Sequence, residues 1–481
     1  MSHSAKSPRR GNPSLLVSIL PVALLIVCLV IIIINKGAGA VQDFSYAILL
    51  SAAGLSAVLA ISTTRRKWTH LLRGIRKSAR QILPAVPILL LIGTMSSTWI
   101  LSGVVPAMIS YGLQLLNPDV FLLMACIVCS VVSVLTGSSW TTIATLGVAM
   151  MGIGTVMGFS QAWVAGAIIS GAYFGDKVSP LSDTTVLASS TCGVPLFTHI
   201  RFLMLTTIPS MTLALIVFAV VGFCTPTITA EHAMNMENAI AGTFVITPWL
   251  LVVPALTIAL IVMRVHTVIT LALSSIAGLI TMFAVQPSIV ATLTNQIGSV
   301  AGVVLTVLST STNILTGDAL LDSLVETSGM QGMLPTVFLV LSAMTFGGTM
   351  LGSGMISTIT QAITRPLHNG RKLVRVTVCT GLMFNSTTGD QYLSIILAGN
   401  IFRTAYKRLG IKPQVLSRAL EDSVSVTSVL IPWNSCGMTQ SAVLGVATLT
   451  YLPCCVFNYL SPLMSILMAR LGYKILEKPQ K

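Results

Sequence analysis

The chain has 481 residues, of which 54% are hydrophobic and only 8% are charged, and its mean hydropathy is +0.89. A water-soluble domain has about 25% charged residues, so this composition excludes a soluble enzyme, a disordered chain and a secreted disulfide scaffold. At about 20 apolar residues per membrane-spanning helix, the sequence predicts an all-α, polytopic membrane protein of roughly ten to twelve transmembrane helices.

Nine apolar segments are expected as membrane spans: 14–34, 44–62, 82–104, 119–135, 202–222, 244–263, 266–286, 335–357 and 438–458. The first is longer than the apolar core of a cleaved signal peptide, so we expect it to stay as an uncleaved span. Segment 288–311 is ambiguous because Asn295 and Gln296 interrupt it. It could be a span, a re-entrant segment or an interfacial helix.

Basic residues outnumber acidic ones, 27 against 13, and give a net charge of +14. They cluster between the apolar segments, in 6–10, 65–80, 365–375, 403–418 and the C-terminal tail. Such clusters follow the positive-inside rule of membrane proteins. We therefore expect a multi-pass protein of the cell inner (plasma) membrane with both termini in the cytoplasm, and no nucleic-acid partner.

Two further zones, 137–200 and 373–436, are apolar but are interrupted by Gly, Pro, Ser, Thr, Asn and Asp. Irregular backbone at membrane depth is tolerated only where it is buried in protein or lines a water-filled cavity. The two zones therefore predict broken or re-entrant helices that surround a site.

Short motifs recur in the same order in the two halves of the chain. Gly93-Thr94-Met95 recurs as Gly348-Thr349-Met350, Thr136-Gly137 as Thr388-Gly389, Asp176–Ser179 as Asp422–Ser425, and Thr191-Cys192-Gly193 as Ser435-Cys436-Gly437. The spacing drifts from 255 residues (348 − 93) to 244 residues (435 − 191). The motifs predict two structural repeats, which we expect to be inverted. Paired halves with interrupted helices are typical of secondary transporters, whose binding sites lie between the repeats.

These repeats divide the chain into five predicted parts. They are two N-terminal spans with a basic cytoplasmic loop at 1–81, a first repeat core at 82–222, linking spans and an acidic segment at 223–334, a second repeat core at 335–470, and a cytoplasmic tail at 471–481.

Acidic residues are so few that each can be judged by its position. Most lie at span ends or in loops, but four aspartates lie in the interrupted zones: Asp176, Asp183, Asp390 and Asp422, the last directly after Glu421. A charged residue at the bilayer centre costs about 2.5–3.5 kcal/mol on insertion scales, so we predict that these four carboxylates bind or couple an ion. The alternative for each one is a helix N-cap or a salt bridge, for example between Asp176 and Lys177.

The side chains around these carboxylates offer hard oxygen ligands, which suit Na⁺ or H⁺ and not a transition metal. The predicted supporting ligands are Ser138, Ser139, Thr141, Ser179, Thr388 and Asn434. Desolvation favours the protonated form of a carboxyl group, so one carboxyl could hold Na⁺ or a proton but not both. Asp176 and Asp390 are the candidates for that exchange, with Na⁺ bound at each. No cofactor is expected beyond the transported Na⁺ and H⁺.

At these residues the sequence resembles the NhaC-type sodium/proton antiporter family of the ion transporter superfamily. The resemblance covers most of residues 80–470 and is most specific in Thr136–Thr142, Gly171–Thr185, Leu196–Arg201, Thr388–Ser394 and Leu416–Gly437. It implies a carrier that exchanges Na⁺ for H⁺, while relatives within the family exchange malate for lactate. The chain departs from the family pattern at Val186, Ala398 and Val429 and in the neutral segment Phe346–Leu351.

We therefore expect a secondary active transporter, and not an enzyme, that exchanges Na⁺ for H⁺ by alternating access. The alternative is a Na⁺/H⁺-coupled exchanger of organic acids such as malate and lactate, or a carrier of another small carboxylate or amino acid, because Lys177, Asn385 and Asn434 could bind a carboxylate. Tyr173 breaks the GxGD motif of an intramembrane aspartyl protease, and the sequence contains neither HExxH nor a Walker motif. The expected partners are Na⁺, H⁺, small organic acids and the lipid bilayer, and a homo-oligomer is left open.

Overall fold

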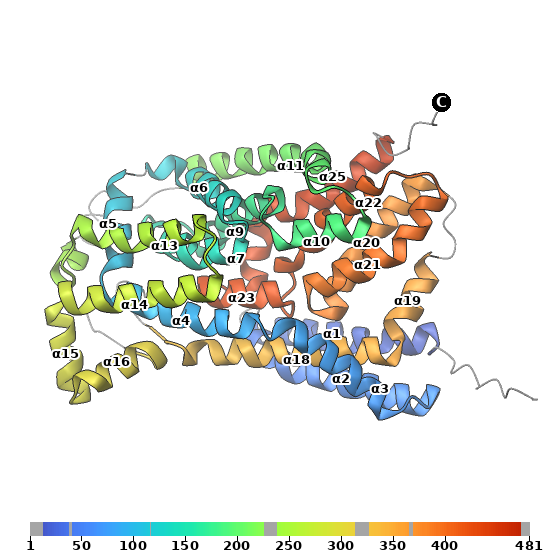
Figure 1. Ribbon diagram of the computed structural model, residues 1–481, viewed down its shortest axis with the longest axis horizontal. Helices are drawn as coiled ribbons and strands as arrows, with labels where there is room; N and C mark the ends of the chain where they lie inside the picture. Colours follow the sequence, from blue (N-terminus) through green and yellow to red (C-terminus); the bar gives the residue numbers. More distant parts are fainter. Residues whose placement is uncertain are drawn as a thin grey trace, which may run out of the picture.

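The computed structural model describes residues 13–37, 41–115, 117–225, 238–312, 327–364 and 369–472. These residues fold into helices joined by short connections (Figure 1). Among them, seven helices are long and apolar enough to cross a membrane, or up to 10 if each bent pair counts as one span. The all-α, polytopic membrane architecture predicted from composition is confirmed.

The first half of the chain contains α1 (Leu15–Lys36), α2 (Val41–Thr64), α3 (Trp68–Ile82), α4 (Ala85–Leu101), α5 (Val104–Leu115), η1 (Pro118–Val120), α6 (Phe121–Thr136), α7 (Ser139–Thr142), η2 (Ile143–Gly147), α8 (Val148–Val156), α9 (Gln161–Val178), α10 (Asp183–Cys192) and α11 (Leu196–Cys224). The linking part contains η3 (Pro248–Leu251), α13 (Val252–Val262), α14 (Thr267–Val285), α15 (Pro287–Ile297) and α16 (Val300–Ser309). The second half contains η4 (Gln331–Met333), α18 (Leu334–Ser353), α19 (Met355–Thr364), α20 (Gly370–Thr388), α21 (Gln391–Arg408), α22 (Pro413–Leu420), η5 (Glu421–Ser425), η6 (Ser428–Leu430), α23 (Ser435–Leu444), α24 (Thr448–Tyr451), η7 (Leu452–Cys454) and α25 (Val456–Leu471).

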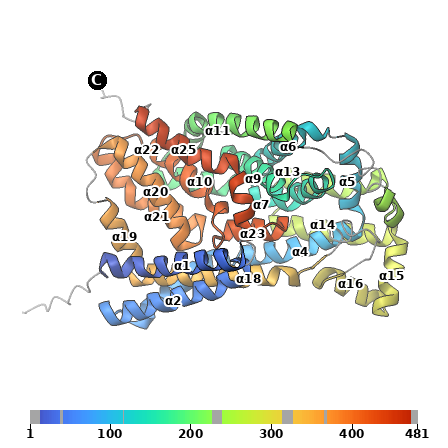
Figure 2. The ribbon, with the colours of Figure 1, turned by 180° about the vertical axis from the view of Figure 1, so that it is seen from behind.

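The long helices run roughly parallel to one another along the long axis of the molecule (Figures 1 and 2). Helices α2 and α3 pack against α18, α14 packs against α4, and α6 packs against α9. The close packing of α6 on α9 depends on glycine, because the Cβ of an alanine at Gly171 would lie 2.1 Å from the carbonyl oxygen of Cys126. These contacts hold the interrupted helices in the middle of the bundle.

Two segments differ from the simple spans expected. In the ambiguous segment 288–311, α15 and α16 meet at an angle of 98°, so it is a broken or re-entrant pair. The expectation of one span over 438–458 is wrong, because α23 ends at Gly445, whose φ of 68° is left-handed, and α25 starts only at Val456. Apolar composition does not reveal such a cap inside a hydrophobic stretch. The acidic residues of 313–326 lie outside the described residues.

The repeat is more regular in the structure than the sequence motifs indicated. Elements of the second half begin 252 residues after their counterparts, for example α20 after η1 (370 − 118 = 252). The same spacing separates the starts of α7 and α21, of α9 and α22, of α10 and α23, and of α11 and α24. In both halves the short helix in fourth position has 10 residues, α10 and α23.

This constant spacing corrects two of the four motif pairs. Thr191-Cys192-Gly193 ends α10, whereas Ser435-Cys436-Gly437 begins α23, so the two motifs are not equivalent. Asp176 lies near the end of α9, but Asp422 lies in the π-helical segment η5, before the equivalent position. The motif spacing therefore drifted because similar polar residues stand at helix breaks that are not equivalent in the two halves. The Thr-Gly pair has the same spacing of 252 residues as the equivalent elements.

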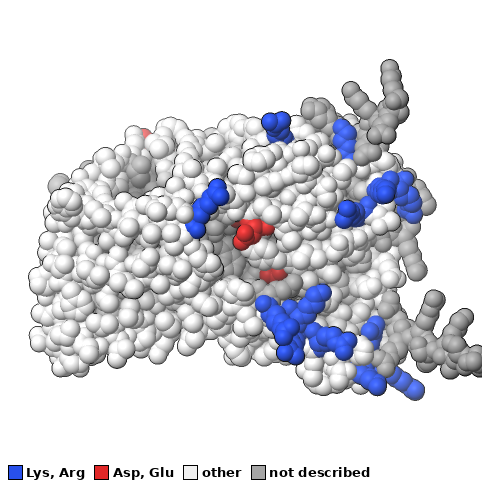
Figure 3. Space-filling model, in the orientation of Figure 1, with Lys and Arg blue, Asp and Glu red and all other residues white. Residues whose placement is uncertain are grey.

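Basic side chains gather toward one end of the long axis, and the opposite end shows none on the face in view (Figure 3). The start of α1 and the end of α25 lie toward that basic end (Figures 1 and 2). Basic clusters that lie toward one end of a bundle are typical of loops on one side of a membrane.

Candidate functional site

Two equivalent turns interrupt the two halves of the molecule. Helix α6 ends at Gly137 (φ 68°) and α20 ends at Gly389 (φ 69°), and in both turns a side chain then caps the next helix. Ser138 Oγ accepts a hydrogen bond from the amide of Thr141 (3.2 Å), and Asp390 Oδ1 accepts one from the amide of Leu393 (2.8 Å). The αL glycine followed by an N-cap residue is the local reason why the chain stops one helix and starts another here.

The threonines of the two turns make matching hydrogen bonds. The Oγ1 of Thr136 lies 3.2 Å from that of Thr142, and the Oγ1 of Thr388 lies 2.7 Å from the Oγ of Ser394. Predicted ligand Thr388 therefore stabilises its turn, and its hydroxyl also donates to the carbonyl oxygen of Asp390 (3.0 Å).

Two further breaks lie beside these turns. Between α9 and α10, the hydroxyl of Ser179 donates to the carbonyl of Val134 (2.8 Å), and Ser182 caps α10. Before α23, Asn434 Oδ1 accepts from the amide of Cys436 (3.1 Å) and its Nδ2 donates to the carbonyl of Asn385 (3.2 Å). Predicted ligands Ser179 and Asn434 are thus used to hold the interrupted backbone.

A cavity of about 570 Å³ lies where these breaks meet. Its polar lining comes from both halves and from the start of α14: Thr136, Ser138, Thr141, Asp176, Ser182, Asp183, Thr184, His266, Thr267, Gln391, Tyr392 and Ser435. Apolar residues of α4 and α14, and Trp140, complete the wall. The cavity therefore joins the first-half and second-half breaks, as a site between two repeats should.

Asp176 and Asp183 are the two predicted carboxylates that line this cavity. Asp176 is partly exposed and its Oδ2 accepts a hydrogen bond from the hydroxyl of Ser139 (2.7 Å). Asp183 lies exposed in the first turn of α10. Ser138 and Thr141, two more predicted ligands, also line the cavity. Five of the ten predicted site residues therefore line it or bond a carboxylate that does: Ser138, Ser139, Thr141, Asp176 and Asp183.

Asp390 lies behind the cavity wall and not in it. It is 1% exposed, and besides capping α21 its Oδ2 lies 3.5 Å from the hydroxyl of Ser435, a lining residue. The amide of Ser435 in turn donates to the carbonyl of Gly389 (2.8 Å). Asp390 is thus the N-cap of α21, which was the alternative to ion binding for each of the four carboxylates. It directly precedes Gln391, which lines the cavity.

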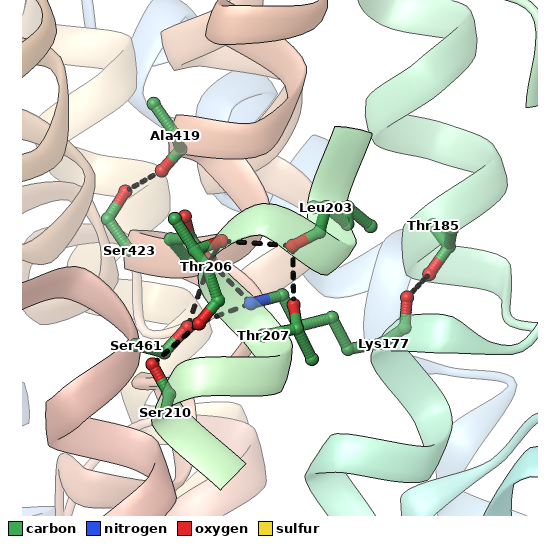
Figure 4. Close-up of polar contacts among 10 residues, drawn as sticks. Lys177, Thr185, Leu203, Thr206, Thr207, Ser210, Ala419, Ser423 and Ser461 are labelled. Atoms are coloured by element: carbon green, nitrogen blue, oxygen red, sulfur yellow. Dashed lines mark hydrogen bonds and ion pairs between the residues drawn. The ribbon is translucent and has the colours of Figure 1, made fainter. Parts of the chain in front are cut away.

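Asp422 lies in a separate, fully buried polar cluster. Its partners Lys177, Thr206 and Ser461 are labelled in Figure 4. Lys177 forms an ion pair with Oδ1 of Asp422, the hydroxyl of Ser461 donates to the same oxygen (2.9 Å), and the hydroxyl of Thr206 lies 3.2 Å from it. Lys177 Nζ also donates to Ser461 (2.8 Å). Lys177 therefore pairs with Asp422 of the other half, and not with its neighbour Asp176.

Sequence reasoning did not identify Gln391, Ser182 or Ser435 as lining residues. Gln391 directly follows Asp390, Ser182 is the N-cap of α10, and Ser435 is the first residue of α23. A constant spacing of 252 residues, applied to the Thr-Gly turn, would have pointed to these positions.

Comparison with known proteins shows the family. The sequence model of the Na⁺/H⁺ antiporter family matches residues 6–193 and 171–473. The chain belongs to the Na⁺/H⁺ antiporter family. It is 38% identical to the Na⁺/H⁺ antiporter NhaC of Alkalihalophilus pseudofirmus over 385 residues, which cover 80% of this chain and 81% of that protein. The resemblance to NhaC-type antiporters is confirmed.

Two other relatives have different names. The chain is 35% identical to the malate-2H⁺/Na⁺-lactate antiporter of Bacillus subtilis over 77% of each chain. It is 31% identical to the arginine/ornithine antiporter ArcD of Halobacterium salinarum over 97% of this chain and 94% of that one. All three relatives are antiporters, so membership of this family makes the chain a membrane transporter and not an enzyme.

Proposed function

We propose that this protein exchanges Na⁺ for H⁺ across the plasma membrane, with Na⁺ bound in the cavity at Asp176. The observation that supports this most directly is the Asp176 carboxylate, which opens to a cavity among four helix breaks and is hydrogen-bonded to Ser139. Carboxylate and hydroxyl oxygens are hard ligands of the kind that bind hard cations. Relatives named as Na⁺/H⁺ antiporters support the choice of ions.

Asp183 and Asp390 have supporting roles in this proposal. Asp183 is exposed beside the cavity and attracts the cation toward Asp176. Asp390 is the second predicted Na⁺ ligand, and it can reach the ion when its hydrogen bond from Leu393 opens during the transport cycle. Asp422, paired with Lys177, is not proposed as a Na⁺ ligand.

Alternating access is supported by a second cavity of about 340 Å³. Helix α23 begins with Ser435 at the first cavity and ends with Leu444 and Gly445 at the second, while Ile92 of α4 lines both. The cavities thus lie toward opposite ends of α23. Movement of α23 against α4 would open one cavity to the site as the other closes.

The directions of two short helices support the inverted relation of the repeats. Helices α10 and α23 both start at the first cavity. The end of α10, at Gly193, lies beside the side chain of Arg403, whereas the end of α23 lines the second cavity. In Figure 1, α10 extends toward the basic end of the molecule and α23 away from it. Equivalent helices that run in opposite directions are expected of an inverted repeat.

A second candidate function is Na⁺/H⁺-coupled exchange of a small organic acid or amino acid. A volume of about 570 Å³ is within the range of small-molecule sites and far exceeds the needs of one dehydrated ion. The N-termini of α7, α10 and α23 point to the cavity, and helix N-termini attract carboxylates. Two relatives are named for carboxylate or amino-acid exchange.

Transport in proteoliposomes distinguishes the two candidates. Purified protein is reconstituted with an internal pH-sensitive dye, and Na⁺, Li⁺, malate, lactate, arginine and ornithine are added separately. Proton flux triggered by Na⁺ alone supports Na⁺/H⁺ exchange. Flux that requires one of the organic solutes supports the second candidate, and no flux with any of them contradicts both.

A further inference from the structure

A second buried carboxyl group, Glu421, is not used by the Na⁺ site described above. It is the first residue of η5, the π-helical segment that continues α22. Single π-helical turns occur frequently at functional sites. The Glu421 side chain is 0% exposed. The hydroxyl of Ser425, at the other end of η5, interacts with it, but neither carboxyl oxygen has a partner with hydrogen-bond geometry among the described residues.

The contrast with the adjacent Asp422 is informative. Both residues are fully buried on the same short segment, yet Asp422 has the ammonium of Lys177 and the hydroxyl of Ser461. Those partners compensate the negative charge of Asp422. Glu421 has no such compensation, and an isolated ionised carboxylate in a protein interior is strongly unfavourable. Glu421 is therefore suited to hold a proton in this conformation.

The charged groups around Glu421 balance one another, so burial without a charged partner decides which state it holds. Lys177, Asp176 and Asp422 interact with it electrostatically, and the buried guanidinium of Arg418 lies in the last turn of α22, so two cations stand against two anions before Glu421 contributes. The helices packed against η5 contribute ionisable or polar side chains to the surroundings of Glu421. These are Cys192 of α10, Tyr406 of α21 and Arg418 of α22, together with the neutral Asn385 of α20 and Ser461 of α25. The Arg418 guanidinium lies over the ring of Phe202, 4.8 Å from its centroid, and forms no hydrogen bond within the described part of the chain.

Two adjacent residues of α9, Asp176 and Lys177, link the surroundings of Glu421 to the cavity. Asp176 faces the cavity, and the next residue, Lys177, reaches the other way into the buried cluster with Asp422. Figure 4 shows Lys177 extending from its helix toward Thr206 and Ser461. A change of charge at Asp176 therefore acts on Glu421 through groups that are already in contact.

We propose that Glu421 is the proton-carrying group of the transport cycle and is separate from the Na⁺ site at Asp176. The proposal rests on the proposed Na⁺/H⁺ exchange. Na⁺ at Asp176 cancels one nearby negative charge, so the carboxyl of Glu421 ionises and its proton passes to water on the open side of the membrane. On the other side, a proton from water binds the carboxylate of Glu421, and the Na⁺ leaves. Because linkage is reciprocal, protonation weakens Na⁺ binding by the factor with which Na⁺ weakens proton binding.

The test uses full-length protein in proteoliposomes and the variant Glu421→Gln, a neutral side chain of similar shape. Two fluxes are measured at saturating Na⁺: exchange of ²²Na⁺ for unlabelled Na⁺, and ²²Na⁺ uptake driven by a pH gradient. The first needs no proton carrier and is expected to continue in Glu421→Gln. The second is expected to fall to the level of protein-free vesicles. Asp119→Asn, which neutralises an exposed carboxylate on η1, is the matched control and should retain both fluxes.

Two results would overturn the assignment. One is pH-driven uptake by Glu421→Gln at the wild-type rate. The other is a folded Glu421→Gln protein that binds ²²Na⁺ as tightly as the wild type, since its neutral side chain mimics the protonated carboxyl and should weaken Na⁺ binding.

A measurement on the wild-type protein covers the case in which Glu421→Gln does not fold. A hydrophobic carbodiimide reacts with protonated buried carboxyl groups, and peptide mass spectrometry locates the adduct. Labelling of Glu421 is expected to decrease as Na⁺ is added, and labelling that Na⁺ leaves unchanged would overturn the proposal. If the wild-type protein shows no pH-driven ²²Na⁺ uptake, the proposed function is contradicted instead. The labelling still tests Glu421 separately, because it requires no transport.

Discussion

The buried ion pair between Lys177 and Asp422 offers a quantitative test of the packing. Both side chains are buried, 1% and 0% exposed, and the pair joins α9 of the first half to η5 of the second. In Lys177→Met, Asp422 keeps the hydroxyls of Thr206 and Ser461 but loses its one ion pair among the described residues. Removing one member of a buried pair costs about 3–5 kcal/mol, so we expect the free energy of unfolding to fall by this amount.

The double variant Lys177→Met with Asp422→Leu removes both charges. Replacing a buried pair by apolar side chains is often neutral or stabilising by about 1–4 kcal/mol, so the double variant should be at least as stable as the wild type. The four proteins form a double-mutant cycle, measured by denaturant titration in detergent. Lys407→Met, at an exposed lysine of α21, is the control and should change stability by less than about 0.5 kcal/mol. A cost below about 1 kcal/mol for Lys177→Met, or a double variant as unstable as the single one, would refute the reasoning.

Three further predictions follow from the helix breaks and the charge distribution. Gly137→Ala should lower the free energy of unfolding by about 1–3 kcal/mol more than Gly298→Ala does. Both glycines have a left-handed backbone, but an added Cβ would lie 2.6 Å from Leu181 at Gly137 and would meet nothing at Gly298. Equal thermal unfolding of the two variants would contradict this. Asp390→Asn should fold normally, because Asn caps a helix as well as Asp does and so keeps the N-cap of α21. The variant should nevertheless lose Na⁺-driven proton flux. Flux at the wild-type rate would show that Asp390 is not part of the site. A C-terminal green fluorescent protein should fluoresce and a C-terminal alkaline phosphatase should be inactive, because the basic clusters predict a cytoplasmic C-terminus; the opposite pair of results would invert the topology.

Composition was enough to predict the membrane fold, because 8% charged residues cannot solvate a chain of this length. The interrupted zones were also predictable, since Gly137 and Gly389 with their polar neighbours mark helix ends within apolar sequence. The break at Gly445 was not, because it lies among apolar residues and its left-handed conformation has no further sequence signal.

The candidate site was predictable only in part, for a physical reason. Position in an interrupted zone selects carboxylates that must be satisfied, but it does not say how each is satisfied. Asp176 faces a cavity, Asp390 caps a helix, and Asp422 pairs with Lys177. These outcomes depend on which helices meet, and the sequence contains no local signal for the contact between α9 and η5.

Proton flux in proteoliposomes containing Asp176→Asn tests Na⁺ binding at Asp176 most directly. Wild-type protein, Asp176→Asn and the control Asp119→Asn are reconstituted in equal amounts, and the internal pH is followed after a step in external Na⁺. We predict proton flux in the wild type and in Asp119→Asn, and flux at the level of protein-free vesicles in Asp176→Asn. Proton flux at the wild-type rate in Asp176→Asn would contradict the proposal that Na⁺ is exchanged at this carboxylate.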